Sequence, residues 1–182
     1  MLDQAQAGRV LETADLLCPP EEVERALQRV AGEISAQLAN VNPLVLAVMT
    51  GAVVFAGQLL PLLNFPLEFD YVHVTRYGNA TVGGTIEWKQ FPVEKIAGRT
   101  VLIVDDILDE GHTLAAIRRR TLEAGAAKFY SAVFAEKKLS KAKPIAADFV
   151  GVELPDRYVF GYGLDVKGAW RNLPAIYAMK KE

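Results

Sequence analysis

Short, uninterrupted apolar runs alternate along this chain with longer stretches in which apolar residues recur every three or four positions. Residues 44–49 and 101–104 are runs of the first kind, and such runs are typical of strands buried on both faces of a parallel sheet. Residues 23–38 are of the second kind and follow Pro19, Pro20 and two glutamates, which predicts an amphipathic helix that begins at the prolines. The first part of the chain therefore predicts a helix followed by a buried strand.

The same alternation continues to the end of the chain. Residues 76–85 are polar and rich in glycine, which predicts a long loop of the kind that often covers a site. Strands that alternate with helices favour an α/β fold with a mainly parallel sheet flanked by helices, and ligands of such folds bind beyond the carboxyl ends of the strands. We expect further helices at residues 53–63 and 113–124, and further strands at residues 67–74, 129–134, 149–152, 158–160 and 176–179.

Composition restricts the class of protein. The chain has 182 residues, of which 51% are hydrophobic and 23% charged, and this suits a single folded domain over residues 1–182. Its net charge of −2 provides no overall basic field, so we expect neither nucleic acid nor a membrane as a partner. Cys18 is the only cysteine and the first ten residues do not resemble a secretion signal, so a cytoplasmic protein is expected.

Three carboxylates, those of Asp105, Asp106 and Asp109, follow the apolar run at residues 101–104. The residue types alone leave three possibilities, which are a solvated turn, a metal site, and a cradle whose carboxylates accept hydrogen bonds from a polyhydroxylated ligand. Gly111 allows close approach of the backbone, and Thr113 opens a predicted helix whose free N–H groups favour an anion. A sugar phosphate would use both halves of this segment, and the pattern favours that hypothesis.

Residues 101–113, VLIVDDILDEGHT, resemble the signature of the type I phosphoribosyltransferases. The resemblance implies the fold of that family, and it implies that Asp105 and Asp106 bind the ribose hydroxyls of 5-phosphoribosyl pyrophosphate (PRPP). Glu110 departs from the signature, because the family usually has Thr or Ser there and a carboxylate facing a phosphate is repulsive. The residues implied to bind the 5′-phosphate are Glu110, Gly111, His112 and Thr113.

The last third of the chain resembles the base-binding region of the hypoxanthine-guanine phosphoribosyltransferases, in FVGVELPDRYVFGYGLD at residues 149–165 and WRNLP at residues 170–174. The resemblance covers residues 44–178. Lys137 matches the family lysine that donates to the purine 6-oxo group, and the flat ring of Tyr158 suits stacking on a purine. Main-chain carbonyls near Val159 and Asp165 are expected to accept from the 2-position edge of the base. Without the resemblance, these residues are an ordinary strand aromatic, a core valine and a solvated lysine.

The resemblance also assigns the pyrophosphate and a magnesium ion. Arg171 is expected to contact pyrophosphate, and Asp165 to hold Mg²⁺ together with Asp105 and Asp106. The family often has a lysine and two glycines after its first buried strand. This chain has Thr50, Gly51 and Ala52 there, so the backbone N–H groups of Thr50 and Gly51 are the remaining pyrophosphate donors. Arg76 and Tyr77 resemble the Ser-Tyr that opens the family's mobile loop, and we expect them to contact pyrophosphate too.

These assignments predict an enzyme of purine salvage. It would transfer the 5-phosphoribosyl group from PRPP to N9 of hypoxanthine or guanine, giving IMP or GMP and pyrophosphate, with Asp109 as the general acid or base for the N7 proton. A core at about residues 40–150 would carry a small hood from about residues 1–20 and 150–182, and the family implies a homodimer or homotetramer. The alternatives are a xanthine-preferring or pyrimidine-directed transferase, a non-catalytic PRPP-binding regulator, and a receiver domain.

Overall fold

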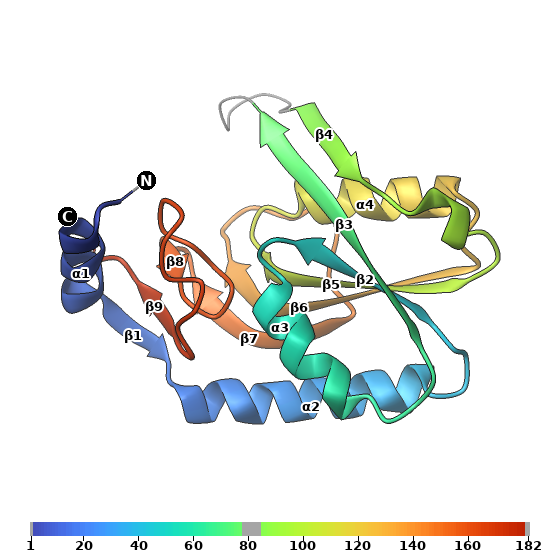
Figure 1. The fold of residues 1–182 in the computed structure, drawn as a ribbon, viewed down its shortest axis with the longest axis horizontal. Coiled ribbons are helices and arrows are strands. Elements are labelled where there is room, and N and C mark those ends of the chain that lie inside the picture. The colour runs from blue at the N-terminus through green and yellow to red at the C-terminus, as the bar shows by residue number, and fades with distance from the viewer. Residues whose placement is uncertain (1, 78–84, 181–182) are drawn as a thin grey trace.

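A six-stranded sheet in the order β4-β3-β2-β5-β6-β7 forms the centre of the molecule (Figure 1). The computed structural model describes residues 2–77 and 85–180. All neighbouring strands are parallel except β4, which runs antiparallel to β3 at the edge. The prediction of an α/β fold with a mainly parallel sheet is therefore confirmed. The strands of this sheet are β2 (Leu44–Met49), β3 (Glu68–Tyr77), β4 (Thr85–Gln90), β5 (Thr100–Leu108), β6 (Lys128–Lys138) and β7 (Phe149–Pro155).

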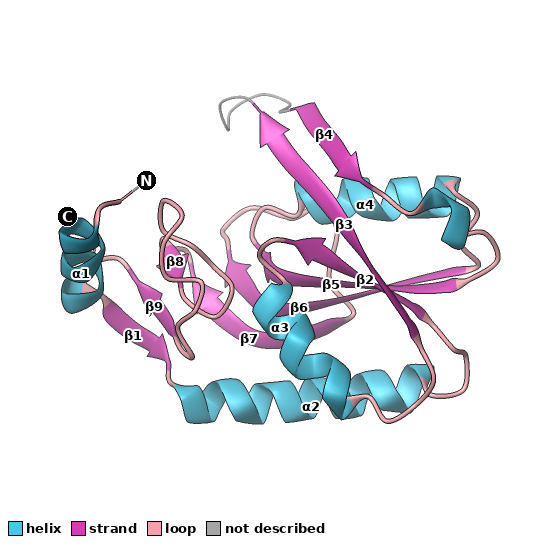
Figure 2. Cartoon of the chain, in the orientation of Figure 1, coloured by secondary structure: helices cyan, strands magenta, loops and turns pink. Residues whose placement is uncertain are grey.

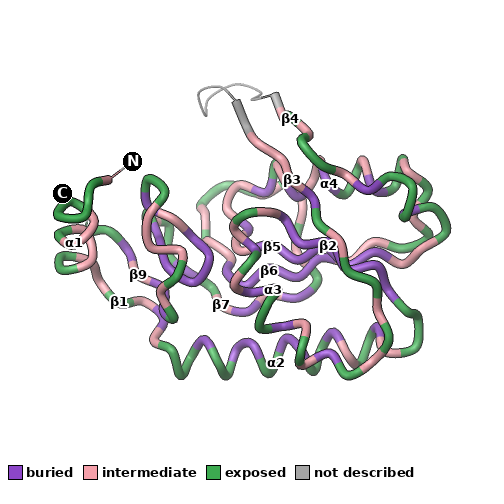
Figure 3. The backbone as a smooth tube through the Cα atoms, in the orientation of Figure 1, coloured by how far each residue is buried: buried purple, intermediate pink, exposed green. Residues whose placement is uncertain are grey.

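Helices cover both faces of the sheet (Figure 2). On one face lie α2 (Pro20–Leu38) and α3 (Val53–Leu59), and on the other lies α4 (His112–Glu123). Successive strand residues point to opposite faces, so Val45 and Ala47 of β2 join the cluster under α2 and α3, while Leu44 and Leu46 join the cluster under α4. Figure 3 shows the result as buried central strands between partly exposed helices. The uninterrupted apolar run at residues 44–49 is thus explained by burial on both faces.

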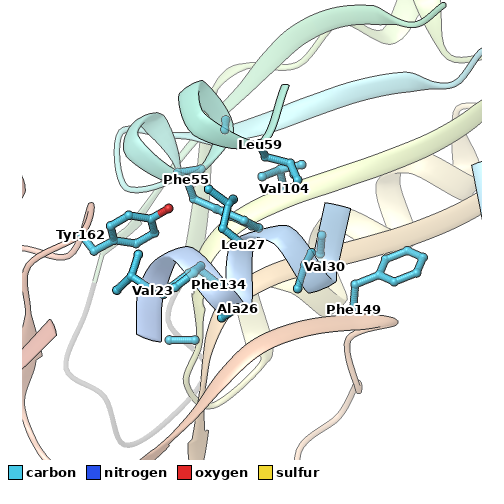
Figure 4. Packing of buried hydrophobic residues seen from close by; sticks show 14 of the residues in the cluster. Val23, Ala26, Leu27, Val30, Phe55, Leu59, Val104, Phe134, Phe149 and Tyr162 are labelled. Atoms are coloured by element: carbon cyan, nitrogen blue, oxygen red, sulfur yellow. The ribbon is translucent and has the colours of Figure 1, made fainter. Parts of the chain in front are cut away.

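The larger core cluster also anchors the carboxy-terminal segment (Figure 4). The ring of Tyr162 packs 4.2 Å from that of Phe134 on β6, and Phe134 in turn lies 5.4 Å from Phe55 on α3. The Tyr162 hydroxyl donates to Oε1 of Gln58 at 2.7 Å, and burial raises the pKa of Tyr162. Residues that follow β8 are consequently fixed against the main sheet.

Both ends of the chain build a second, three-stranded sheet. It contains β1 (Asp15–Cys18), β9 (Ile176–Ala178) and β8 (Val159–Phe160) in that order, with antiparallel pairs. Helix α1 (Gln4–Thr13) precedes it, and the two termini lie at the same end of the molecule (Figure 1). Arg157 joins the two ends by donating to Asp15 Oδ2 at 2.6 Å and to the Met179 carbonyl at 2.7 Å. Cys18 is buried, and burial raises its pKa to about 11.

The structure corrects the end of the central strand. We expected it to stop at Val104, but β5 continues to Leu108, so Asp105 and Asp106 lie within the strand. The reason is the neighbouring strand: β6 runs to Lys138, and Asp105 and Leu108 pair with Val133 and Glu136. Backbone pairing outweighs the polarity of the two carboxylates, because each buried N–H and C=O needs a partner.

Several elements were not predicted. The stretch expected to be one loop at residues 76–85 contains the end of β3 and the start of β4, and residues 78–84 lie outside the described residues. Helix α1, strand β1 and the short 3-10 helix η2 (Val93–Lys95) were also missed, and the helix expected at residues 53–63 is formed by α3 and the 3-10 helix η1 (Leu60–Leu62). Within the described part of the chain, no helix combines the length and the apolar character needed to span a membrane.

Candidate functional site

A cavity of about 460 Å³ opens at the carboxyl ends of β2, β3 and β5, and is called the main cavity below. This is the edge where parallel α/β sheets bind ligands. The carboxy-terminal segment contributes to it through Asp165 and Arg171. The predicted site residues that line it are Thr50, Gly51, Asp105, Asp106, Asp109, Glu110, Gly111, His112, Thr113, Asp165 and Arg171.

A second space of about 250 Å³, called the side cavity below, adjoins the first. It shares Asp106, Asp109 and Asp165 with the main cavity. Because these carboxylates line both spaces, a ligand that fills the two cavities passes the same acidic groups. The predicted base-binding residues Lys137, Tyr158, Val159 and Asp165 all line the side cavity.

Asp105 and Asp106 place two adjacent carboxyl groups at the bottom of the main cavity. The N–H of Asp106 donates to Asp105 Oδ1 at 2.9 Å, and Asp105 is only 8% exposed. Burial raises the pKa of Asp105 well above its usual range, and the neighbouring Asp106 carboxylate raises it further. Burial also raises the pKa of Asp106, while the Asp105 hydrogen bond and Arg171 act in the opposite direction. Two such acids are costly unless hydroxyl donors or cations bind them.

Three segments meet at Asp106. A Cβ atom on Gly51 would overlap with the Asp106 carboxylate, and a Cβ atom on Gly163 would overlap with the Gly51 carbonyl. Gly163 also has a φ of +96°, which residues other than glycine rarely adopt. The loop after β2, the end of β5 and the segment after β8 can therefore approach each other only through these two glycines.

The loop that precedes α4 is shaped to receive an anion. Gly111 is the N-cap of α4 with a φ of +84°, so Thr113 lies in the first turn, where N–H groups lack helical partners. The Glu110 carboxylate forms an ion pair with the Lys141 ammonium, whose pKa it raises. The acid that departs from the signature is therefore held by a lysine. Sequence reasoning missed Lys141 because it stands in a lysine-rich stretch that is typical of a solvated loop.

Lys137 and Asp109 form an ion pair in the side cavity. Lys137 Nζ lies 2.9 Å from Asp109 Oδ2, and the Lys137 side chain is 13% exposed against 47% for Asp109. Each residue was predicted to contact the base, but their pairing was not. It depends on the register of β5 with β6, in which Leu108 pairs with Glu136.

A second ion pair joins Asp165 and Arg171 between the two cavities. Asp165 Oδ1 binds Arg171, and Asp165 Oδ2 accepts from the Gly168 N–H at 2.7 Å. Arg171 Nη1 also donates to the Gly163 carbonyl at 2.6 Å. The Tyr158 hydroxyl donates to the Asp165 carbonyl at 3.4 Å. These contacts fix the arginine beside Asp106 and keep the exposed Tyr158 ring at the rim of the side cavity.

The predicted metal ligands Asp105, Asp106 and Asp165 line one cavity but are not assembled as a ligand set. Across residues 2–77 and 85–180, no group of three or more His, Cys, Asp or Glu side chains is placed to hold a metal ion. Magnesium bound with phosphates usually takes only one or two protein carboxylates and several waters. The donor set therefore fits a metal that arrives with a phosphorylated ligand.

Some residues that line the cavities were not predicted from the sequence. Two residues that were predicted have side chains outside the described part of the structure. Arg76 and Tyr77 end β3, and their side chains are outside the described residues. Apolar and neutral lining residues carry no motif, so only the fold identifies them. The lining residues that we did not predict include Met49, His73, Thr75, Ile107 and Leu164.

The chain resembles known proteins over most of its length. It matches the phosphoribosyl transferase domain family at residues 19–167. It is 32% identical over 168 residues to the hypoxanthine-guanine phosphoribosyltransferase of Streptococcus pneumoniae strain R6, covering 92% of this chain and 93% of that protein. The protein of the same name from Bacillus subtilis is 32% identical over 166 residues, with 91% and 92% covered. The solved structure of a hypoxanthine-guanine phosphoribosyltransferase from Bacillus anthracis matches with a TM-score of 0.85 and 26% identity over 91% of this chain and 98% of that chain.

Proposed function

The chain belongs to the phosphoribosyltransferase family, and on this premise we propose that it transfers the 5-phosphoribosyl group of PRPP to N9 of hypoxanthine or guanine. The products are IMP or GMP and pyrophosphate, which makes it an enzyme of purine salvage. One observation supports this most directly. The main cavity, with its acids and anion-binding loop, adjoins the side cavity, with its lysine and tyrosine, at Asp106, Asp109 and Asp165.

The sugar phosphate belongs in the main cavity. Asp105 and Asp106 accept hydrogen bonds from the ribose hydroxyls, and these acids also balance positive charge that develops on the ribose as the bond to pyrophosphate breaks. The 5′-phosphate binds the N–H groups at the start of α4, around Gly111, His112 and Thr113. Glu110 contributes its backbone there, while its carboxylate stays with Lys141.

Pyrophosphate leaves the ribose toward Arg171 and the backbone N–H groups of Thr50 and Gly51. Mg²⁺ bound to PRPP would neutralise this polyanion as it departs. Asp165 is the protein carboxylate best suited to hold the ion, because it lines the main cavity beside Arg171, the proposed pyrophosphate contact, and Asp105 and Asp106 then bind the ribose. The ion pair between Arg171 and Asp165 keeps the arginine in place for the pyrophosphate. Arg76 and Tyr77 remain proposed pyrophosphate contacts.

The base belongs in the side cavity. On a 6-oxo purine, O6 and N7 are neighbouring atoms of one edge. Lys137 and Asp109, 2.9 Å apart, match these two atoms: the ammonium donates to O6, and the carboxyl group exchanges the proton at N7. Tyr158 stacks on the ring, and the carbonyls of Val159 and Asp165 accept from N–H groups at the 2-position edge.

We also propose a homodimer or homotetramer that works on small molecules in the cytoplasm. Large apolar side chains are exposed on β3, where Phe69 is 45% and Tyr71 42% exposed, and such groups are enriched at protein interfaces. The buried thiol of Cys18 suits a reducing compartment. Light scattering of the purified chain and fractionation of its host cells test these two expectations.

A spectrophotometric assay with PRPP, Mg²⁺ and each of hypoxanthine, guanine and xanthine tests the activity. Turnover with hypoxanthine or guanine is the expected result. Turnover with xanthine alone would identify the xanthine-preferring alternative. Binding of PRPP without turnover of any of the three bases would overturn the proposal in favour of a regulator.

A further inference from the structure

Lys143 is the most enclosed cation near the proposed base site, and it lies outside both cavities. Its side chain is 11% exposed. The ammonium group donates to the Leu108 carbonyl at 3.0 Å, to Glu136 Oε1 at 3.0 Å and to the Lys137 carbonyl at 2.6 Å. An ammonium group has three N–H donors, so all of them are used. The group is thus held at one point by three acceptors.

Those acceptors belong to the ends of β5 and β6, beside Lys137 and Asp109, the two residues proposed to bind the base. Leu108 is the last residue of β5 and directly precedes Asp109, and Lys137 stands on β6. The pairing of β5 with β6 extends to Leu108 and Glu136. Lys143 therefore links the backbone of the two strands at the level of the ion pair between Lys137 and Asp109. Glu136 supplies the counter-charge that allows the ammonium group to be enclosed.

The residues after Lys143 pack against the loop at the start of α4, residues 110–113, which is proposed to bind the 5′-phosphate. A Cβ atom at Gly111 would lie 3.3 Å from Pro144 Cδ and 3.4 Å from Ile145 Cγ2. Ile145 also packs against the smaller core cluster. The packing of Pro144 and Ile145 therefore holds the backbone of residues 143–145 in place. Lys143 is positioned both by this backbone and by the three acceptors of its ammonium group.

We propose that Lys143 is a positioning residue for purine recognition, which sets the spacing of Lys137 and Asp109 by joining the backbone beside each of them. The inference rests on the proposed function for its chemical meaning, because that spacing must match O6 and N7 of the base. It assigns to Lys143 no contact with substrate. Displacements of about 1 Å at a reacting group can lower rates by up to about a hundredfold.

Steady-state kinetics of three variants test the assignment. Lys143→Met keeps the aliphatic stem but removes the donors, and it should lower kcat/KM for hypoxanthine by about ten- to a hundredfold. The KM for PRPP should stay within about twofold, because the contacts of Pro144 and Ile145 at Gly111 do not involve the Lys143 side chain. Lys143→Arg retains charge and donors and should restore most of the loss. The matched control is Lys138→Met, because Lys138 pairs with Glu153 where both side chains are at least 60% exposed.

The assignment would be overturned if Lys143→Met impaired the kinetic parameters for hypoxanthine and for PRPP by the same factor. It would also be overturned if Lys143→Met had wild-type kinetics. Thermal unfolding of each variant shows whether it is folded. If Lys143→Met does not fold, Glu136→Gln keeps an acceptor for Lys143 but removes the counter-charge, and the same selective loss should appear in weaker form. A crystal structure of the variant provides a readout that does not need activity. The distance from Lys137 Nζ to Asp109 Oδ2, now 2.9 Å, should increase, and an unchanged distance would refute the proposal even if the wild type transferred to no base.

Discussion

The main cavity and the side cavity are built in different ways. About half of the residues that line the main cavity belong to one contiguous segment, residues 105–114, at the end of β5 and the start of α4. The side cavity takes its polar groups from β5, from β6 and from the segment after β7. Their charges differ as well, since Asp105 and Asp106 are adjacent acids whose pKa values are raised by burial, whereas Lys137 is paired with Asp109. A strand end followed by a helix can form a sugar-phosphate site locally, but a base site requires distant segments to meet.

Asp109 tests the border between the cavities, because it lines both. Asp109→Asn keeps the shape but removes the exchangeable carboxyl proton, so kcat should fall by about 10²- to 10⁴-fold, while the KM for PRPP changes little. Steady-state kinetics with hypoxanthine measure both parameters. Asp70→Asn is the control, because Asp70 pairs with Lys95 and lines neither cavity. Equal losses in turnover and PRPP binding would count against a proton-transfer role.

Gly51 tests how closely the segments of the main cavity must approach. In Gly51→Ala the new methyl group overlaps with the Asp106 carboxylate, so kcat/KM for PRPP should fall about a hundredfold. Gly57→Ala on α3 is the matched control, because a Cβ atom added there would meet nothing within 4 Å. That change should leave activity intact and stabilise the helix by about 0.5–1 kcal/mol. Similar kinetics in both variants would show that the approach at Gly51 is not required.

The contiguous region was also the easier one to predict. Residues 101–113 carry their own sequence pattern, so the residues proposed to bind the sugar phosphate could be named before the fold was known, and the structure places them around one cavity. The extension of β5 beyond Val104 could not be predicted, because it depends on pairing with β6. The ion pairs of Lys141 and Lys143 could not be predicted either, because a lysine in a polar loop has the same local pattern whether it is solvated or paired. Strand β1 was missed because it pairs with β9 at the other end of the chain, and helix α1 was missed because none of its residues is buried.

Lys137 tests the side cavity alone. Lys137→Gln removes a charged donor that is worth about 1.5–3 kcal/mol in a hydrogen bond, so kcat/KM for hypoxanthine should fall roughly ten- to a hundredfold. The KM for PRPP should not change, and the preference for hypoxanthine over adenine should weaken because a 6-amino purine gains nothing from the lysine. Lys138→Gln is the control. A parallel rise in the KM for PRPP would mean that the two cavities are not separable at this residue.

Lys141 tests the main cavity with a smaller effect. The ammonium group is exposed, so its loss in Lys141→Gln should raise the KM for PRPP only about threefold, by removing a positive charge beside the Glu110 carboxylate near the phosphate. Glu110→Thr should remove that effect, so that Lys141→Gln has no consequence in the double variant. Kinetics of the two single variants and the double variant measure the coupling. Additive effects would show that the pair does not act as a unit.

Asp105 tests whether the acids of the main cavity lower stability. Its folded pKa is raised above the unfolded value of about 3.9, so the native state holds its proton more tightly and wild-type stability falls as pH rises above about 4. Asp105→Asn still accepts from the Asp106 N–H but does not ionise. It should therefore unfold about 2–4 °C higher than wild type at pH 7, and the difference should shrink toward pH 4.

Asp70→Asn is the control of opposite sign for this measurement. The Lys95 hydrogen bond lowers the pKa of Asp70, so its contribution is present at neutral pH and is lost as pH falls through the folded pKa. Its replacement should lower the melting temperature at pH 7 and not in acid. Thermal unfolding from pH 2 to pH 8 distinguishes the two variants, because the Asp70 contribution is lost only below the unfolded pKa of about 3.9. If Asp105→Asn were no more stable than wild type at pH 7, ionisation of Asp105 beside Asp106 would not lower the stability of the folded protein. The two cavities would then differ in where their charged groups lie but not in how those groups affect stability.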